Sequence, residues 1–158
     1  MAAQIEEMRT ERRARSLNMI RKLIDSRTEM LTLYSQLARF KPFKNDVDVA
    51  SLLQEFCQSL IDYTANAHFQ LYRYFAENNE RRQEILKVAD DIYPQIITST
   101  NGILDFNEKY DCGGDCPLLD GLEVDLSTLG EALADRIELE DRLIAAFGYT
   151  PAPEGEPA

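Results

Sequence analysis

The chain has 158 residues and a formal net charge of −11, and this length fits one domain with a sizeable core. Hydrophobic residues make up 44% of it and charged residues 28%, the balance of a globular rather than a disordered chain. So acidic a surface repels phosphate backbones, which argues against direct nucleic-acid binding and suits a basic protein partner. No apolar run is long enough for a membrane span, and the N-terminus lacks the apolar core of a secretory signal. The three cysteines are an odd count, which fits a reducing cytoplasm better than a disulfide framework.

Helical hydrophobic periodicity covers most of the chain. It divides into four long amphipathic segments and one short segment, separated by breaks that are rich in Pro, Gly or Asn. In chain order, the predicted helices cover about residues 6–39, 48–76, 84–90 and 94–110, and then a segment from a cap at residue 125 or 127 to residue 148.

Residues with known capping preferences mark several of these helix ends. Asp48 is a suitable N-cap for the second helix, and Pro94 suits the first turn of the third long one. Asp125 or Ser127 can cap the last helix, and Gly148 is a natural residue just beyond its end. These signals predict an element boundary at each of the positions.

Four long amphipathic helices in one small domain favour a bundle. We therefore predict an all-α fold, an antiparallel four-helix bundle with an additional short helix, in a single domain over residues 1–148. Residues 149–158 are rich in Pro, Gly and Glu and are predicted to form a disordered acidic tail.

The second helix carries the most informative outer face. Phe69 and Asp62 lie on the side opposite its apolar stripe, with Glu55, Asn66 and Arg73 around them. An aromatic residue beside a carboxylate on an outer face is typical of a partner-binding patch. The alternative is that the N-terminal arm or another helix covers Phe69. The stripe itself consists of Leu53, Phe56, Cys57, Leu60, Thr64, Leu71 and Phe75.

Two charged residues fall within apolar stripes: Arg27 in the first helix and Glu140 in the last. A charge on a core face is costly unless it is paired or reaches solvent. We therefore expect Arg27 and Glu140 to pair across the bundle in a structural polar core that His68, at the edge of its stripe, could join.

Functions that require a metal ion, a redox reaction or catalysis have less support in the sequence. Cys112 and Cys116 have a spacing seen in zinc sites, but the site would have to recruit Cys57 and His68 from one distant helix. A redox- or metal-responsive adaptor that uses these cysteines remains an alternative, as does an enzyme in a bundle fold. A di-iron site would need two Glu-x-x-His motifs, and the chain has a single histidine. We therefore expect no catalytic residues, no metal site and no cofactor.

The chain resembles a known family in two blocks. The sequence EFCQSLIDYTANAHFQLY, residues 55–72, is similar to the hallmark stretch of the Rsd/AlgQ family, the regulators of sigma D. LSTLGEALADRIELEDRLI, residues 126–144, resembles the last helix of that family, and Arg27 and the Tyr93-Pro94-Gln95 run also fall in register. The likeness covers roughly residues 15 to 148, except that the middle region matches poorly and the loop with Cys112 and Cys116 departs from the family.

The resemblance implies an all-helical anti-sigma factor of the cytoplasm. Members of the family bind the primary sigma factor of RNA polymerase and hold it away from the core enzyme, and some are described as regulators of alginate synthesis. Of the family's binding positions, the Asp of LIDY corresponds to Asp62 and the aromatic of the HF pair to Phe69. The expected partner is thus the C-terminal helix-turn-helix domain of the primary sigma factor, bound by a monomer, and contact with other sigma domains is left open.

Overall fold

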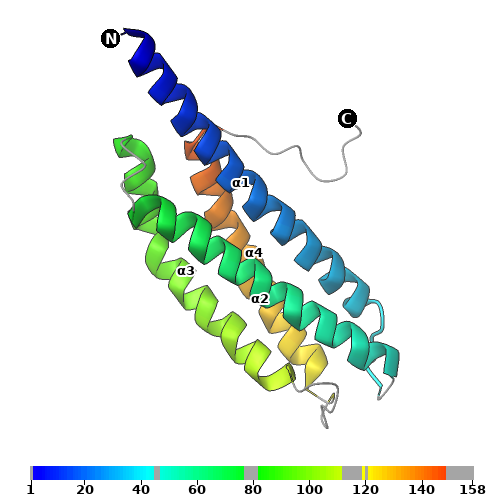
Figure 1. Ribbon diagram of the computed structural model, residues 1–158. Coiled ribbons are helices and arrows are strands. Elements are labelled where there is room, and N and C mark those ends of the chain that lie inside the picture. The colour runs from blue at the N-terminus through cyan, green and yellow to red at the C-terminus, as the bar shows by residue number, and fades with distance from the viewer. Residues whose placement is uncertain (1, 45–46, 77–81, 112–118, 120, 149–158) are drawn as a thin grey trace.

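The computed structural model describes residues 2–44, 47–76, 82–111, 119 and 121–148, without the side chains of residues 12, 72, 73 and 76. The tail predicted for residues 149–158 lies outside the described part. The described chain is all helical and confirms the predicted bundle (Figure 1). Its helices are α1 (Ala2–Ala38), α2 (Val47–Ala76), α3 (Gln83–Tyr110) and α4 (Leu122–Ala146).

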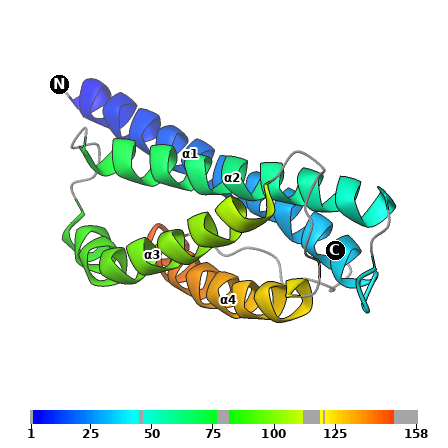
Figure 2. The ribbon, with the colours of Figure 1, turned by 90° about the horizontal axis from the view of Figure 1, so that it is seen from below.

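Successive helices run in opposite directions and form two layers. Figure 2 shows the α1–α2 hairpin above the α3–α4 hairpin, crossing it at an angle. Neighbours along the chain pack against each other, most closely α1 with α2 and α3 with α4, and less extensively α2 with α3. None of the helices in the described part is both long enough and apolar enough to cross a membrane.

The buried apolar side chains form two clusters. The larger one joins all four helices and includes Leu23, Phe56, Leu60, Ile103 and Leu126. The smaller one packs the start of α3 against the end of α4 and consists of Ile85, Ile92, Ile96, Leu139 and Leu143. Half-buried Leu71 and Phe75 of α2 contact both clusters. These two side chains therefore connect the clusters.

The helix ends agree with the sequence in part. Gly148 has a φ of +84° and donates its N–H to Ala145 O at 2.9 Å, as expected of a residue that terminates a helix. Asp125 and Ser127 do not cap α4, because the helix begins at Leu122 and both residues lie inside it. Asp48 likewise lies in the first turn of α2 rather than before it. The acidic side chains of Asp48 and Asp125 still favour these helix starts, since they face the positive end of the helix dipole.

The predicted short helix at residues 84–90 is wrong as a separate element, because α3 runs without interruption from Gln83 to Tyr110 and contains Pro94. Proline removes one backbone donor and usually bends a helix rather than ending it when both sides are well packed. Ile85 and Ile92 before the proline and Ile96 after it belong to one apolar cluster. Figure 2 shows the first part of α3 turning away from the direction of the rest.

Candidate partner-binding site

The outer face of α2 carries the predicted patch. Glu55, Asp62, Asn66 and Phe69 are all exposed, as helical periodicity predicts. Asp62 is not isolated, because Gln58 Nε2 donates a hydrogen bond to its Oδ1 at 3.1 Å, one turn away on the same face. The side chain of Arg73 lies outside the described residues. The described members of the patch thus lie together on the solvent side of one helix.

Phe69 is 61% exposed, although it is a large apolar side chain. Its ring contacts the neighbouring ring of His68 edge-on, with 5.8 Å between the centroids. The N-terminal arm does not cover it, because Ile5 and Met8, the arm's apolar side chains, are themselves about half exposed. Figure 1 shows the first turns of α1 extending past the other helices. Phe69 therefore presents its apolar area to solvent in the free protein.

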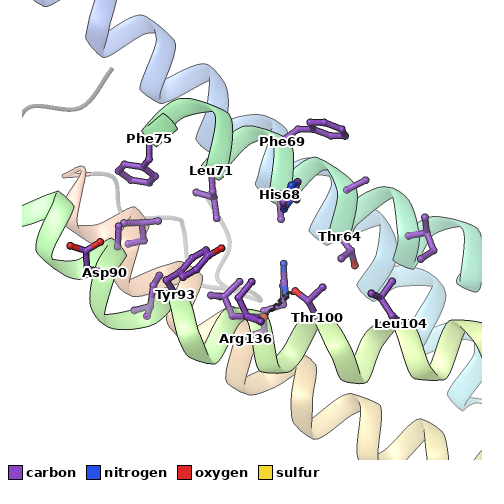
Figure 3. A pocket seen from close by; sticks show the side chains of 18 of the residues that line it. Thr64, His68, Phe69, Leu71, Phe75, Asp90, Tyr93, Thr100, Leu104 and Arg136 are labelled. Atoms are coloured by element: carbon purple, nitrogen blue, oxygen red, sulfur yellow. Dashed lines mark hydrogen bonds between the residues drawn. The ribbon is translucent and has the colours of Figure 1, made fainter. Parts of the chain in front are cut away.

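Phe69 also stands at the mouth of a pocket between α2 and α3. The pocket has a volume of about 530 Å3 and is lined mainly by apolar side chains from these two helices. Three of its α3 lining residues, Tyr93, Ile97 and Leu104, are exposed. Figure 3 shows two of them, Tyr93 and Leu104, on α3 across the pocket from α2. Together with Phe69 they form the apolar rim of the pocket, and exposed apolar area gathered around one pocket is typical of a binding surface.

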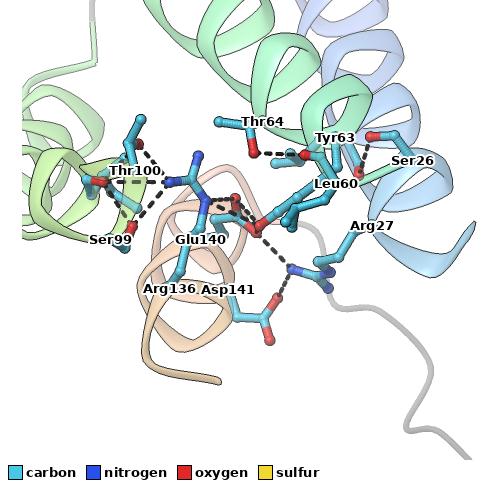
Figure 4. Close-up of polar contacts among 12 residues, drawn as sticks. Ser26, Arg27, Leu60, Tyr63, Thr64, Ser99, Thr100, Arg136, Glu140 and Asp141 are labelled. Atoms are coloured by element: carbon cyan, nitrogen blue, oxygen red, sulfur yellow. Dashed lines mark hydrogen bonds and ion pairs between the residues drawn. The ribbon is translucent and has the colours of Figure 1, made fainter. Parts of the chain in front are cut away.

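A buried polar network lies behind the pocket (Figure 4). Glu140 of α4 is fully buried and contacts Arg27 of α1, with 3.4 Å between Oε1 and Nη1. The expected contact between these residues is therefore present. Arg27 Nη1 also reaches Asp141 Oδ1 at 2.9 Å, and the Tyr63 hydroxyl lies 2.7 and 2.8 Å from the two Glu140 oxygens.

Arg136 completes this network, and our sequence reasoning missed it. Its side chain is 2% exposed, and its Nε donates to Glu140 Oε2 at 3.3 Å and to the Tyr63 hydroxyl at 3.2 Å. Its Nη1 reaches Ser99 Oγ and Thr100 Oγ1 of α3, both at 2.9 Å. A signal was available, because Arg136 follows Leu133 by three residues and precedes Glu140 by four, which is the spacing of one helix face.

Burial and neighbouring charges shift the pKa values of the residues in this network. Burial raises the pKa of the Glu140 carboxyl above its ordinary value, against the opposite effects of Arg136, Tyr63 and Arg27. Burial, followed by the charge of Glu140, raises the pKa of Tyr63 well above its ordinary value, so this hydroxyl stays protonated and can donate. For Arg27, burial lowers the pKa, but the charges of Glu140 and Asp141 outweigh it and the pKa is raised. Removing one partner would leave the others buried with less compensation.

His68 does not belong to the buried core that we expected it to join. Its side chain is exposed and lines the pocket beside Phe69. The crossing of α2 and α3 leaves the edge of the α2 stripe open at this point, so a residue at that edge faces the pocket instead of α1 and α4. Arg136 and Tyr63 occupy the positions in the network where His68 could have contributed.

Cys57, the cysteine that lies within the described residues, is part of the core. Cys57 is fully buried, and burial together with the charge of Asp111 raises its pKa to about 12. Its thiol therefore stays protonated at neutral pH, which disfavours metal binding and oxidation. Cys112 and Cys116 lie outside the described residues. Within the described ranges, no group of three or more His, Cys, Asp or Glu side chains could hold a metal ion.

Comparisons with known proteins place the chain among its relatives. Residues 1–147 match the family model described as regulator of RNA polymerase sigma(70) subunit, Rsd/AlgQ. A regulator of sigma D from Enterobacter sp. (strain 638) is 33% identical over 155 residues, which span 92% of this chain and 88% of that protein. A regulator of sigma D from Salmonella newport (strain SL254) is 32% identical over 147 residues, 91% of this chain and 90% of the relative. No solved structure matches the chain.

Proposed function

This chain belongs to the Rsd/AlgQ family of regulators of the RNA polymerase sigma(70) subunit, and we propose that it acts as an anti-sigma factor. It binds the primary sigma factor and keeps it from the core enzyme and from promoters. It does so as a monomer in the cytoplasm, by occupying a surface rather than by catalysis, and it needs no cofactor.

The observation that carries this proposal is the 61% exposed ring of Phe69 on the outer face of α2. Aromatic side chains, Phe among them, are enriched in protein interfaces relative to the rest of the surface, and a few anchor residues supply most of the binding energy. The apolar rim of the pocket adjoins this ring, and Asp62 and Asn66 supply polar groups on the same face. An apolar centre with polar groups at its edge is the usual anatomy of a protein interface.

The charge of the chain suits this partner. The C-terminal domain of a primary sigma factor is a helix-turn-helix that reads DNA, so its recognition surface is basic. A bundle with a net charge of −11 attracts such a surface and speeds the encounter. On α2, Asp62 and Glu55 would contact basic side chains of sigma while Phe69 enters an apolar recess. Sigma bound in this way could not contact promoter DNA with the same surface.

The test is the affinity of the purified chain for the C-terminal domain of the primary sigma factor, measured by titration calorimetry. Phe69→Ala removes the proposed anchor, and burying a Phe side chain contributes about 1.5–3 kcal/mol. We therefore expect sigma affinity to fall by more than about tenfold, with little change in the thermal unfolding midpoint. Val124→Ala is the matched control, because Val124 is an apolar α4 residue that is 68% exposed and lies outside the pocket.

Three results would count against the proposal. Absence of any sigma binding by the wild-type chain would reject the anti-sigma function itself. Equal losses for Phe69→Ala and Val124→Ala would mean that the outer face of α2 is not the interface. A large loss of stability in Phe69→Ala, with sigma affinity intact, would show instead that Phe69 supports the fold.

A further inference from the structure

The interior of the pocket has a feature that an apolar protein-docking groove does not require. Most of its lining is apolar, including Ile92, Ile96, Leu71 and Leu143, but a guanidinium group lies at its base. Figure 3 shows Arg136 pointing from α4 into the space between α2 and α3, below His68 and Leu71. At about 530 Å3, the pocket has the size typical of small-molecule sites.

One edge of that guanidinium is unused. Nε and Nη1 of Arg136 make all of its hydrogen bonds, to Tyr63, Glu140, Ile96, Ser99 and Thr100. Nη2 carries two further N–H donors, and neither has a partner among the described residues. Asn107 Oδ1 is the one buried polar side-chain atom of the described residues without a partner, so Nη2 is open to the pocket. An anionic acceptor that reaches Nη2 there would form charge-assisted hydrogen bonds.

The local charges favour an anionic acceptor. Glu140 is the only carboxylate in the described chain that contacts Arg136, and it shares its charge with Arg27. Asp141, whose side chain is 46% exposed, offsets part of the Arg27 charge. Among the described residues that line the pocket, Asp90 is the only carboxylate; it is exposed and lies away from Arg136 in Figure 3. The pocket base is thus a cationic point in apolar surroundings, where charge-assisted hydrogen bonds are strong.

We propose that the pocket between α2 and α3 binds a small amphipathic carboxylate. The carboxylate accepts hydrogen bonds from Arg136 Nη2, and the apolar body lies along Ile92, Ile96 and Leu71 toward the rim. Binding at this site does not depend on the proposed sigma interaction and is measured without sigma.

The probe is decanoate, used below its micellar concentration with the full chain, and decan-1-ol is the uncharged comparison. Calorimetry gives affinity and stoichiometry, and methyl NMR reports on the isoleucines. We expect one decanoate per chain, with shifted methyl signals for Ile92 and Ile96, and binding at least tenfold tighter than that of decanol. That ratio corresponds to the loss of one charge-assisted hydrogen bond.

Two variants locate the site. Arg136→Met should reduce decanoate affinity about tenfold or more while leaving decanol affinity nearly unchanged. Because Arg136 also belongs to the buried network, Ile97→Asp provides a second probe. Ile97 is 38% exposed at the rim, so a carboxylate there repels decanoate without emptying the core. Val124→Asp, on an exposed α4 position outside the pocket, adds the same charge and should bind decanoate like the wild type.

The proposal is overturned if decanoate does not bind the wild-type chain, or if decanol binds as tightly. It is also overturned if a folded Arg136→Met variant keeps its affinity for decanoate. If Arg136→Met does not fold, equal decanoate affinities of Ile97→Asp and Val124→Asp reject the site. If decanoate fails to bind while folded Arg136→Met loses sigma affinity, the pocket serves the protein partner and the small-molecule proposal is wrong.

Discussion

The contact between α1 and α4 and the contact between α2 and α3 are built in opposite ways. Between α1 and α4, Arg27 reaches Glu140, and the Tyr34 hydroxyl donates to Leu126 O at 2.9 Å. Gly130 allows this approach, since a Cβ at this position would collide with the Tyr34 hydroxyl. Between α2 and α3 a pocket of about 530 Å3 stays open, with Phe69 and Ile97 exposed at its rim.

The difference separates residues that hold the fold from residues available to bind. The α1–α4 contact buries charge, so each member depends on the others and removal of one is costly. The α2–α3 contact leaves apolar area in water that no other described part of the chain covers, so this area is available to a binding partner. Adjacent residues of α2 illustrate the division, because Tyr63 is fully buried in the network while Asp62 is exposed.

The largest expected effect is on the closed contact. Glu140→Ala would leave Arg27 and Arg136 buried without their shared carboxylate, and we expect the free energy of unfolding to fall by about 3–5 kcal/mol. Glu140→Gln should cost less, because the amide keeps a hydrogen-bond acceptor. Chemical denaturation measures both. Asp141→Ala is the matched control: it removes the half-exposed partner of the same Arg27 and should cost at most about 1 kcal/mol. Similar losses for Glu140→Ala and Asp141→Ala would contradict the structural role of Glu140.

On the outer face of α2 the expected effect is on binding instead. Asp62→Ala should weaken binding of the C-terminal sigma domain by about 2 kcal/mol, the lower end of the range for a charge pair desolvated in an interface. Its unfolding midpoint should stay close to that of the wild type, since the only described hydrogen bond of the Asp62 side chain is with exposed Gln58. Calorimetry and thermal melting measure the two quantities. Unchanged sigma affinity would remove Asp62 from the interface, and a lower midpoint would make it structural.

A pair of glycine substitutions tests how closely α1 and α4 approach. Gly130→Ala would force Tyr34 to move, because the new Cβ would collide with its hydroxyl and lie 3.1 Å from Cζ. Overpacking outweighs the helix propensity gained, and we expect a net loss of about 1–2 kcal/mol in unfolding free energy. Gly102→Ala on α3 has nothing within 4 Å of the new Cβ and should stabilise by up to about 1 kcal/mol. If Gly130→Ala stabilised the chain as Gly102→Ala is expected to do, the close approach would be refuted.

The smallest expected effect is pH dependent and concerns the junction of α3 and α4. Hydrogen bonds from Lys109 and Tyr110 hold the pKa of Asp125 below its ordinary value. The stability that Asp125 contributes is therefore present above its ordinary pKa and lost as the pH falls through the lowered one. Asp125→Asn should cost about 0.2–1 kcal/mol at neutral pH, and the difference from the wild type should shrink below about pH 4.

Denaturant titrations between pH 3 and pH 8 measure this difference. Glu123→Gln, an exposed position in the same helical turn, is the control. A wild-type advantage over Asp125→Asn that grows toward low pH would contradict the assigned sign.

Much of the fold and part of the site could be predicted because helical periodicity is a local property. The apolar stripe of α2 fixes which residues face inward, and this alone turned Asp62 and Phe69 outward. The requirement that a buried charge be paired led from Arg27 to Glu140. Arg136 was not predicted as a member of the buried network, because a long cationic side chain near a helix surface usually reaches solvent. The stripe assigned to the last helix was also drawn from its apolar residues alone.

The sequence by itself determined the helices, their buried faces and the family to which the chain belongs, since each of these depends on residues close together along the chain. Only the tertiary structure decided that α3 continues through Pro94, that His68 lies outside the buried network, and that a pocket opens between α2 and α3. These features depend on how whole helices cross. Periodicity assigns a residue to a face, but the crossing angle and the side chains of the facing helix determine whether that face is filled, paired or left open.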